Sequence, residues 1–502
     1  MTYGSRFWVR PAFVVLAAWG CSADDSRLYA SDPGTAAGSD SAGSMAPAAP
    51  EGQPGSADAP PVAAPAAAAA TTSKRPGSTR PEEQVPESAP LIPPEDAEPA
   101  TAPVPDDGAQ TWVFDPSAVH TYELELDPER WAALQRDALD EEYTEADLIA
   151  GGRSLGRVGL RFKGNLGTLV SCFADDGTRR CDKLSMKLKF DEYEPEQRFF
   201  GLKRLNFNSM LYDDALMRER IAYRVYQEMG VVAPRAAHAR LVINGEDQGV
   251  FSLVEDVDGR FTDGHFDGGD GNLYKEAWPG NLDDAVLARA LETNEDIADN
   301  TGMLAFHADL LAAAPDEVPG VLSRYLDVDT TLAYLAVDRS ISNWDGITAF
   351  FCYDESCENH NYYWYQDETE LRFTLIPWDL DNTFDSSPLE GVPSLFESQE
   401  DCSLSFEAAG RRVRAPACDP LLRGLSDDGA SYGAELQRLL EGPFAPGVIE
   451  SWIDEIETLL APEVITDDRG PDLSTFQSGV ERLRTNVSRL REQAQVEREL
   501  HR

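Results

Sequence analysis

The chain has 502 residues, of which 42% are hydrophobic, so it can bury a sizeable core and form two to four domains. It carries 89 acidic against 43 basic residues, a formal net charge of −46 at pH 7. Such a charge repels nucleic-acid phosphates and anionic membrane surfaces, so we expect no nucleic-acid partner.

The first 21 residues predict an export signal. Arg6 and Arg10 precede a short apolar run, residues 13–19, that is too short to cross a bilayer as a helix. The run ends in the sequence AWGC, which resembles a bacterial lipobox. We therefore expect Cys21 to carry a lipid and to anchor an exported protein to the cell envelope, at the outer membrane or the cell surface. Cleavage by an ordinary signal peptidase, followed by secretion, is the alternative.

Residues 22–108 are rich in Ala, Pro, Gly, Ser, Asp and Glu and contain few large apolar residues. Such a composition cannot bury enough surface to offset the entropy lost on ordering. We predict a disordered, partly polyproline spacer that holds the folded part, residues 109–502, away from the envelope.

The six cysteines that remain after Cys21 fall into pairs that are close in sequence. Local disulfides in an oxidising compartment account for this spacing. A zinc site is the rival interpretation, but no C-x-x-C motif is present and the pairs lie far apart. The expected disulfides are Cys172–Cys181, Cys352–Cys357 and Cys402–Cys418.

The first half of the folded part reads as strand-rich. Residues 120–126 alternate between apolar and polar side chains, and Asp127 then starts a helix. Strands are also expected within residues 156–165, 183–191 and 202–209. In residues 183–191 the apolar side chains face one way and Ser185, Lys187 and Lys189 face the other.

The next segments predict a prominent helix over residues 213–230 and a hairpin over residues 236–258 that turns at Asn244-Gly245. From Asp327 onward helices dominate, interrupted by a second hairpin within residues 358–381. The charged C-terminal segment, residues 476–502, predicts a long helix with a solvated face. The fold class is therefore α+β, with a strand-rich half followed by a helical half.

Four segments, in this order, resemble the signatures of the spore coat protein H (CotH) family of atypical kinases. They are RFKGN (161–165), GLKRLNFNS with the helix and hairpin after it (201–258), SISNWDG (340–346) and HNYYWY…LIPWDLDNTF (360–384). GNLYK (271–275) lies between them, and the likeness is best over about residues 112–384.

This resemblance implies a protein-kinase-like, two-lobed fold that transfers the γ-phosphate of ATP, with Mg²⁺ or Mn²⁺, to Ser or Thr of an exported or cell-surface protein. The alternative is a catalytically inactive surface-binding or coat- and envelope-assembly module on the same fold.

The metal ligands that the resemblance implies are oxygen donors near the second hairpin. Asp379 takes the part of the metal-binding kinase Asp, and Asn361 the part of the Asn that holds a second metal. Asp381 is a further candidate, because carboxylates at positions i and i+2 of an extended segment point the same way. A solvated acidic turn is the alternative interpretation of these aspartates.

Asp345 follows a helix, and the resemblance makes it the catalytic-loop Asp that accepts or orients the substrate hydroxyl. An ordinary helix-terminal turn would also place an Asp here.

The resemblance assigns the nucleotide contacts to a few charged residues. Lys187 is favoured as the lysine that holds the phosphates, with Glu219 as its partner on the helix. Solvent-facing lysines on an amphipathic strand are the alternative for Lys187 and Lys189. Lys163 would lie in a phosphate-facing turn, and Glu255 near the adenine amino group. Neither a G-x-G-x-x-G loop nor a Walker A motif is present.

Overall fold

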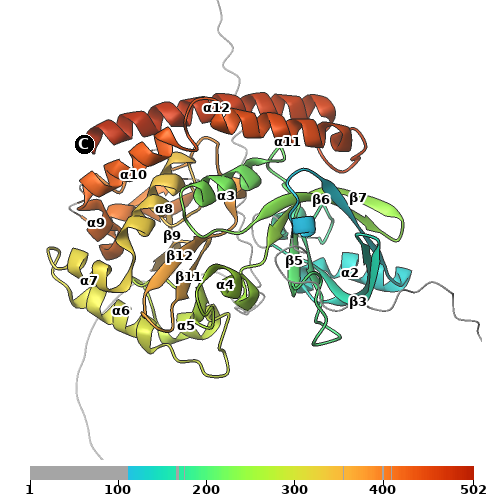
Figure 1. The fold of residues 1–502 in the computed structure, drawn as a ribbon, viewed down its shortest axis with the longest axis horizontal. Helices are drawn as coiled ribbons and strands as arrows, with labels where there is room; N and C mark the ends of the chain where they lie inside the picture. The colour runs from blue at the N-terminus through green and yellow to red at the C-terminus, as the bar shows by residue number, and fades with distance from the viewer. Residues whose placement is uncertain are drawn as a thin grey trace, which may run out of the picture. The chain divides into compact units, whose positions relative to one another are not determined.

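The computed structural model describes residues 111–501 apart from 165–168, 175, 354–355, 390, 398, 400 and 409 (Figure 1). The expected signal peptide, Cys21 and the spacer over residues 22–108 lie outside the described residues. Within them the predicted α+β class is confirmed, because a strand-rich first part is followed by a largely helical second part.

In the described part of the first half, seven strands close into a barrel in the order β1-β2-β3-β4-β5-β7-β6. The closing pair, β1 and β6, is parallel, whereas the other neighbours are antiparallel. Their bounds are β1 Val119–Glu125, β2 Thr144–Ala150, β3 Arg153–Phe162, β4 Met186–Lys189, β5 Arg204–Asn208, β6 Ala236–Ile243 and β7 Glu246–Glu255.

The alternation read from the sequence sets which side chains fill the barrel. Leu184, Met186, Leu188 and Phe190 are all buried in the barrel core, as their period of two predicts. The predicted β6–β7 hairpin is confirmed. Asn244 and Gly245 have φ angles of 51° and 76°, the left-handed pair that a two-residue hairpin turn needs.

Helix α3 (Arg218–Glu228) lies between the barrel and the second half and contacts β6 (Figure 1). It begins five residues later than the sequence pattern predicted. The carboxylate of Asp213 accepts the backbone N–H groups of Ala215, Met217 and Arg218 at 3.0, 2.8 and 2.8 Å. These bonds fold the preceding residues into a turn rather than a first helical turn.

The second half is built around a sheet of order β12-β11-β8, with β8 Asn272–Lys275, β11 Tyr362–Gln366 and β12 Phe373–Pro377. The hairpin predicted within residues 358–381 is thus confirmed, and it gains β8 as a third strand. The helix predicted after Asp127 is α2 Pro128–Arg136. The sequence predicted that helices dominate from Asp327 onward, where α8 Val328–Ser340 begins. Among the described residues, four further helices already precede that point: α4 Gly259–His265, α5 Asp284–Ala290, α6 Thr301–Ala312 and α7 Val318–Tyr325.

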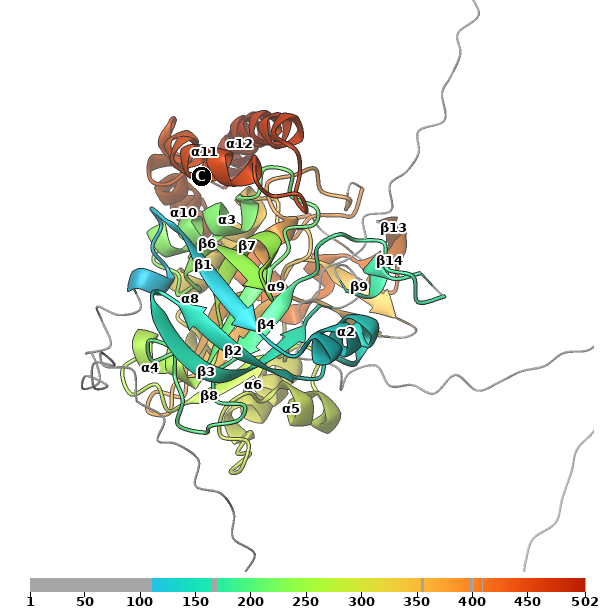
Figure 2. The same cartoon turned by 90° about the vertical axis from the view of Figure 1, so that its right-hand side faces the viewer.

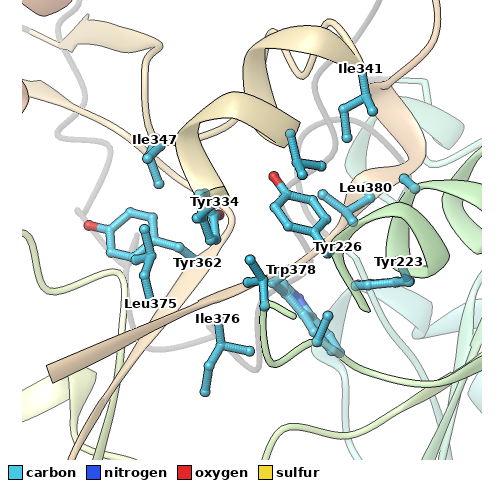
Figure 3. Packing of buried hydrophobic residues seen from close by; sticks show 14 of the residues in the cluster. Tyr223, Tyr226, Tyr334, Ile341, Ile347, Tyr362, Leu375, Ile376, Trp378 and Leu380 are labelled. Atoms are coloured by element: carbon cyan, nitrogen blue, oxygen red, sulfur yellow. The ribbon is translucent and has the colours of Figure 1, made fainter. Parts of the chain in front are cut away.

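Large aromatic side chains join α3, α8 and the β11–β12 hairpin into one core (Figure 3). The rings of Tyr226 on α3 and Tyr334 on α8 lie 4.9 Å apart. The Tyr226 hydroxyl donates to the buried carboxylate of Asp338 at 3.0 Å. This core fixes the end of α8 relative to the hairpin.

A four-stranded sheet of order β10-β9-β14-β13 follows the end of α8 (Figure 2). Its strands are β9 Phe350–Tyr353, β10 Ser356–Glu358, β13 Ser405–Ala408 and β14 Arg411–Arg414. The Cys352–Cys357 disulfide joins β9 to β10, and Cys402–Cys418 closes the segment that contains β13 and β14. With Cys172–Cys181, all three predicted disulfides are confirmed.

The C-terminal helices are α9 Pro420–Ser426, α10 Gly429–Glu441, α11 Val448–Val464 and α12 Leu473–Leu500. Helix α12 packs on α11 and α10 (Figure 1). Only one side of α12 forms the solvated face that the sequence predicted, because an apolar stripe at helical spacing is buried along the length of the helix. The stripe comprises Phe476, Val480, Leu483, Val487, Leu490 and Ala494. Among the described residues, no helix is long and apolar enough to cross a membrane.

A buried ion pair fastens the α11–α12 connection to the barrel. Lys183 Nζ lies 3.3 Å from Asp467 Oδ2 and donates to the carbonyl oxygen of Val250 at 2.7 Å. The same Asp467 oxygen accepts the backbone N–H of Val250 at 2.9 Å. A Cβ at Gly249, whose φ is +92°, would collide with this carboxylate.

We expect Asp467→Ala to lower the free energy of unfolding by about 3–5 kcal/mol, because it leaves the Lys183 ammonium buried without its counter-charge. Denaturant unfolding monitored by fluorescence measures the loss. The exposed neighbour Asp468→Ala is the matched control and should stay close to the parent. Equal stability of the two variants would show that the pair is not needed.

Candidate active site

Asp345 lies in the turn after α8 and is completely buried. The side-chain amide of Asn361 donates to its Oδ2 at 3.0 Å and to its backbone oxygen at 2.9 Å. Asn382 donates to the same Oδ2 at 3.4 Å. Two amides from either side of the β11–β12 hairpin therefore fix the orientation of this carboxylate.

Asn361 and Asp379 lie on the two chain segments at the open end of that hairpin. The carbonyl oxygen of Asn361 accepts the backbone N–H of Trp378 at 3.1 Å, and the N–H of Asp379 donates to the Tyr223 hydroxyl at 3.1 Å. Both Asn361 and Asp379 are left-handed, with φ angles of 65° and 51°. Left-handed backbone at residues other than glycine clusters at functional sites.

The expected extended geometry of Asp379 and Asp381 is wrong. After Asp379 the chain enters a 3-10 turn, Leu380–Asn382. The Thr383 hydroxyl donates to the Leu380 carbonyl at 2.7 Å, and the N–H of Phe384 donates to the Ile341 carbonyl at 2.7 Å. These bonds curl the segment back toward the end of α8, so both aspartates approach Asp345 from a turn and not along a strand.

Burial, together with the charge of Asp379, raises the pKa values of several acidic groups in this region. Burial raises the pKa of Asp345 to about 8; the His360 charge opposes this shift and the Asp379 charge adds to it. Burial, followed by the charge of Asp379, raises the pKa of Asp381 well above its usual range. Burial and the Asp379 charge also raise the pKa of Glu219 to about 7. A cation at this point would relieve all of these groups.

The residues present fit a hard divalent cation. Three buried oxygens here have no hydrogen-bond partner: Asp345 Oδ1, Asn361 Oδ1 and Asp381 Oδ1. Carboxylate and amide oxygens are the ligands that Mg²⁺ prefers. The described residues contain no group of three His, Cys, Asp or Glu side chains arranged for a metal. A magnesium ion would therefore need the Asn361 amide, water and phosphate oxygens besides carboxylates.

A basic pocket lies next to these acids. Trp378, Tyr363 and Asp256 contribute to its wall, and its cations come from the barrel strands β3, β4 and β5 and from β8 of the second sheet. In a chain of charge −46, such a concentration of positive charge is suited to phosphate groups. The cations that line it are Arg161, Lys163, Lys187, Arg204 and Lys275.

The predicted Lys187–Glu219 pair is wrong. Lys187 Nζ forms an ion pair with Asp256 Oδ1 at 3.1 Å, because β4 and the residue after β7 meet on the pocket side of the barrel. The lysine associated with Glu219 is instead Lys163, whose Nζ donates to Asn208 Oδ1 at 2.9 Å. Burial lowers the pKa of Lys163 to about 8, although the charge of Asp379 counteracts the shift.

Glu255 ends β7, as predicted, but its carboxylate is engaged. Arg235 donates its backbone N–H at 3.1 Å and its Nε at 2.9 Å to Glu255 Oε2. The predicted adenine contact would therefore have to involve the backbone at this position, and that role stays a prediction.

Sequence reasoning missed Glu276. This residue follows β8 with a φ of 54° and accepts the backbone N–H of Asn361 at 2.9 Å. Its Oε2 lies 3.7 Å from His360 Nδ1. Burial opposes ionisation of Glu276, but the hydrogen bond and charge of His360 hold its pKa lowered to about 2. GNLYK ends one residue before Glu276, yet nothing in the local pattern signals that β8 pairs with β11.

The fold and the site together define a two-lobed, kinase-like protein, in which a strand barrel and a helical half enclose buried acids beside a basic pocket. The family model described as "CotH kinase protein" matches residues 160–495, more than half of the chain. The chain therefore belongs to the CotH kinase family, and membership implies the use of ATP.

Curated relatives are distant. The chain is 23% identical over 279 residues to the inner spore coat protein H of Bacillus subtilis (strain 168), covering 52% of this chain and 68% of that protein. It is 26% identical over 177 residues to an inner spore coat protein H-like protein of the same organism, covering 35% and 50%. It is 22% identical over 204 residues to invasin CotH7 of Rhizopus delemar, covering 37% and 33%.

We expect Asp345→Asn to remove a pH dependence of stability. The raised pKa of about 8 means that folded Asp345 keeps a proton that the unfolded chain, with a pKa of about 3.9, releases. Its contribution to stability is thus present below about pH 4 and lost as pH rises to about 8. Between pH 5 and pH 8 the parent should lose on the order of 3 kcal/mol relative to the variant.

Urea unfolding of both proteins at several pH values measures this difference, and the exposed Asp316→Asn is the control. A constant difference between parent and Asp345→Asn across this range would contradict the raised pKa.

Proposed function

We propose that this protein is an exported or surface-anchored kinase that transfers the ATP γ-phosphate to Ser or Thr hydroxyls of exported or cell-surface proteins. The observation that carries the proposal is the meeting of buried acids with unpartnered oxygens and a basic pocket, inside a chain of the CotH kinase family. Phosphoryl transfer needs this combination, because it depends on positioning and on neutralising phosphate charge.

Asp345 is the residue proposed to receive or orient the substrate hydroxyl proton. Its Oδ2 is held by Asn361 and Asn382, while its Oδ1 has no partner and remains available to a hydroxyl. A general base must be ionised and within hydrogen-bond reach of the proton it accepts. Positive charge bound beside Asp379 would favour the ionised form of Asp345.

Asp379, Asn361 and Asp381 are proposed to hold Mg²⁺ or Mn²⁺ between them and the nucleotide. The ion would neutralise charge on the phosphates and align them. Lys163 and Lys187, which both line the basic pocket, are proposed to contact phosphate, and the charge of Asp379 acts on Lys163.

Export and anchoring are the second part of the proposal. Three disulfides are typical of proteins that fold in an oxidising compartment. Lipidation at Cys21, followed by the 22–108 spacer, would tether the kinase to the envelope and let it reach substrates there.

The central test is phosphate incorporation by the purified chain, with its disulfides intact, on incubation with ATP and Mg²⁺ or Mn²⁺. Removing a general base or a metal ligand should lower the rate at least 10²-fold, so we expect Asp345→Ala and Asp379→Ala to be nearly inactive. Intact mass reads out incorporation, and the exposed Asp401→Ala serves as a control that should match the parent.

A parent that neither incorporates phosphate nor binds ATP with Mg²⁺ in calorimetry would remove the kinase proposal. Such a result would favour a binding or assembly module on the same fold. Partner capture that survives Asp379→Ala would then be the expected behaviour.

For the anchor, we expect Cys21→Ser to move the protein from the membrane fraction to the soluble fraction of the producing cell, because the thiol that receives the lipid is absent. Detergent partitioning measures the shift, and mass spectrometry of the mature N-terminus identifies the lipid. Unchanged partitioning of Cys21→Ser would leave simple secretion as the better account.

A further inference from the structure

Lys163 and Glu219 are joined through a third side chain. Both residues lie in the part of the chain that the structure describes, and both are buried. No direct ion pair connects them. Asn208, at the end of β5, lies between them. Its Oδ1 accepts from Lys163 Nζ at 2.9 Å, and its Nδ2 donates to Glu219 Oε1 and Oε2 at 3.0 and 3.1 Å.

The orientation of the Asn208 amide follows from its partners. An ammonium group can only donate and an ionised carboxylate can only accept, so the oxygen must face Lys163 and the nitrogen must face Glu219. Asparagine is one of the few side chains that can satisfy a cation and a carboxylate at once. Aspartate has the shape but lacks the donor.

The barrel supports this bridge with a second residue. Asn208 on β5 pairs directly with Ser252 on β7. The Ser252 hydroxyl donates to Glu219 Oε2 at 2.8 Å. Glu219 is therefore held by neighbouring residues of two adjacent strands, and α3 is fixed to the barrel at this point.

The arrangement leaves the charge of Lys163 available. A direct carboxylate partner would neutralise much of the ammonium charge, whereas a neutral amide fixes its position and leaves the charge to act elsewhere. Lys163 lines the basic pocket, whereas Asn208 and Glu219 do not. Asn208 thus acts on the pocket through Lys163.

We propose that Asn208 is a positioning residue that couples helix α3 to the phosphate-binding lysine, replacing a direct Lys163–Glu219 ion pair by an amide bridge. The inference rests on the proposed kinase function. It implies that ATP use depends on a residue that touches neither nucleotide nor substrate.

The test compares the steady-state kinetics of the full chain with those of Asn208→Leu, Asn208→Asp and Ser252→Ala. Asn208→Leu should lower kcat/KM for ATP about 10- to 100-fold, because Lys163 loses its hydrogen-bond acceptor. Asn208→Asp should lose as much, since its carboxylate would face that of Glu219 and neutralise Lys163. Ser252→Ala, which leaves Lys163 bonded, should lose roughly threefold to tenfold.

Melting temperatures and calorimetric ATP affinity accompany the kinetics, and the exposed Asn281→Leu is the control. A folded Asn208→Leu with kcat/KM within about twofold of the parent would overturn the inference, as would losses that follow melting temperature alone. If Asn208→Leu does not fold, the isosteric Asn208→Asp decides. If the parent protein transfers no phosphate, the proposed function is overturned, and this inference falls with it. If the parent and the Asn208 variants transfer phosphate equally well, only the inference is overturned.

Discussion

Burial of several carboxyl groups in one region is the constraint on which the candidate site depends. Asp345, Asp379, Asp381 and Glu219 share one region, and the charge of Asp379 acts on each of the other three. Burial raises the pKa of each of these three groups, and the charge of Asp379 adds to each rise. Neutral donors hold two of these groups, because Asn361 and Asn382 donate to Asp345 while Asn208 and Ser252 donate to Glu219.

Most cations of the basic pocket come from the barrel. Lys187 lies on β4 and Lys163 directly follows β3, whereas Lys275 comes from β8 of the second sheet. Asp379 does not line this pocket, but it lies close enough for its charge to act on Lys163. Positive and negative charge at this short separation suit a ligand that carries negative charge together with a bound cation.

Local patterns in the sequence predicted the elements but not their junctions. Alternation gave the buried face of β4, and the Asn244-Gly245 pair gave the β6–β7 turn, since both depend on neighbouring residues alone. The three disulfides were likewise predicted from cysteines that lie close together in the sequence. Family resemblance brought Asp345, Asn361 and Asp379 to one place, which the structure supports.

The predictions that were wrong or missing concern contacts between segments that are distant in the sequence. Lys187 was assigned to Glu219, but closure of the barrel sets Asp256 beside it. Asn208 lies within the GLKRLNFNS segment, but its role appears only when β5, β7 and α3 are assembled. The curl after Asp379 likewise needs the carbonyl of Ile341, more than thirty residues earlier. The charged sequence of α12 concealed a buried stripe, because long polar side chains outnumber the apolar ones.

Helix α12 also sets an order of events during synthesis. Asn486 donates to the carbonyl of Phe384 at 3.0 Å and Arg489 to that of Asp385 at 3.4 Å, so the turn that carries Asp379 is supported by residues more than a hundred positions later. A nascent chain can complete its barrel while this turn still lacks its support. The basic pocket, whose wall includes Trp378 next to Asp379, and the acids beside it are therefore complete only after α12 has been synthesised.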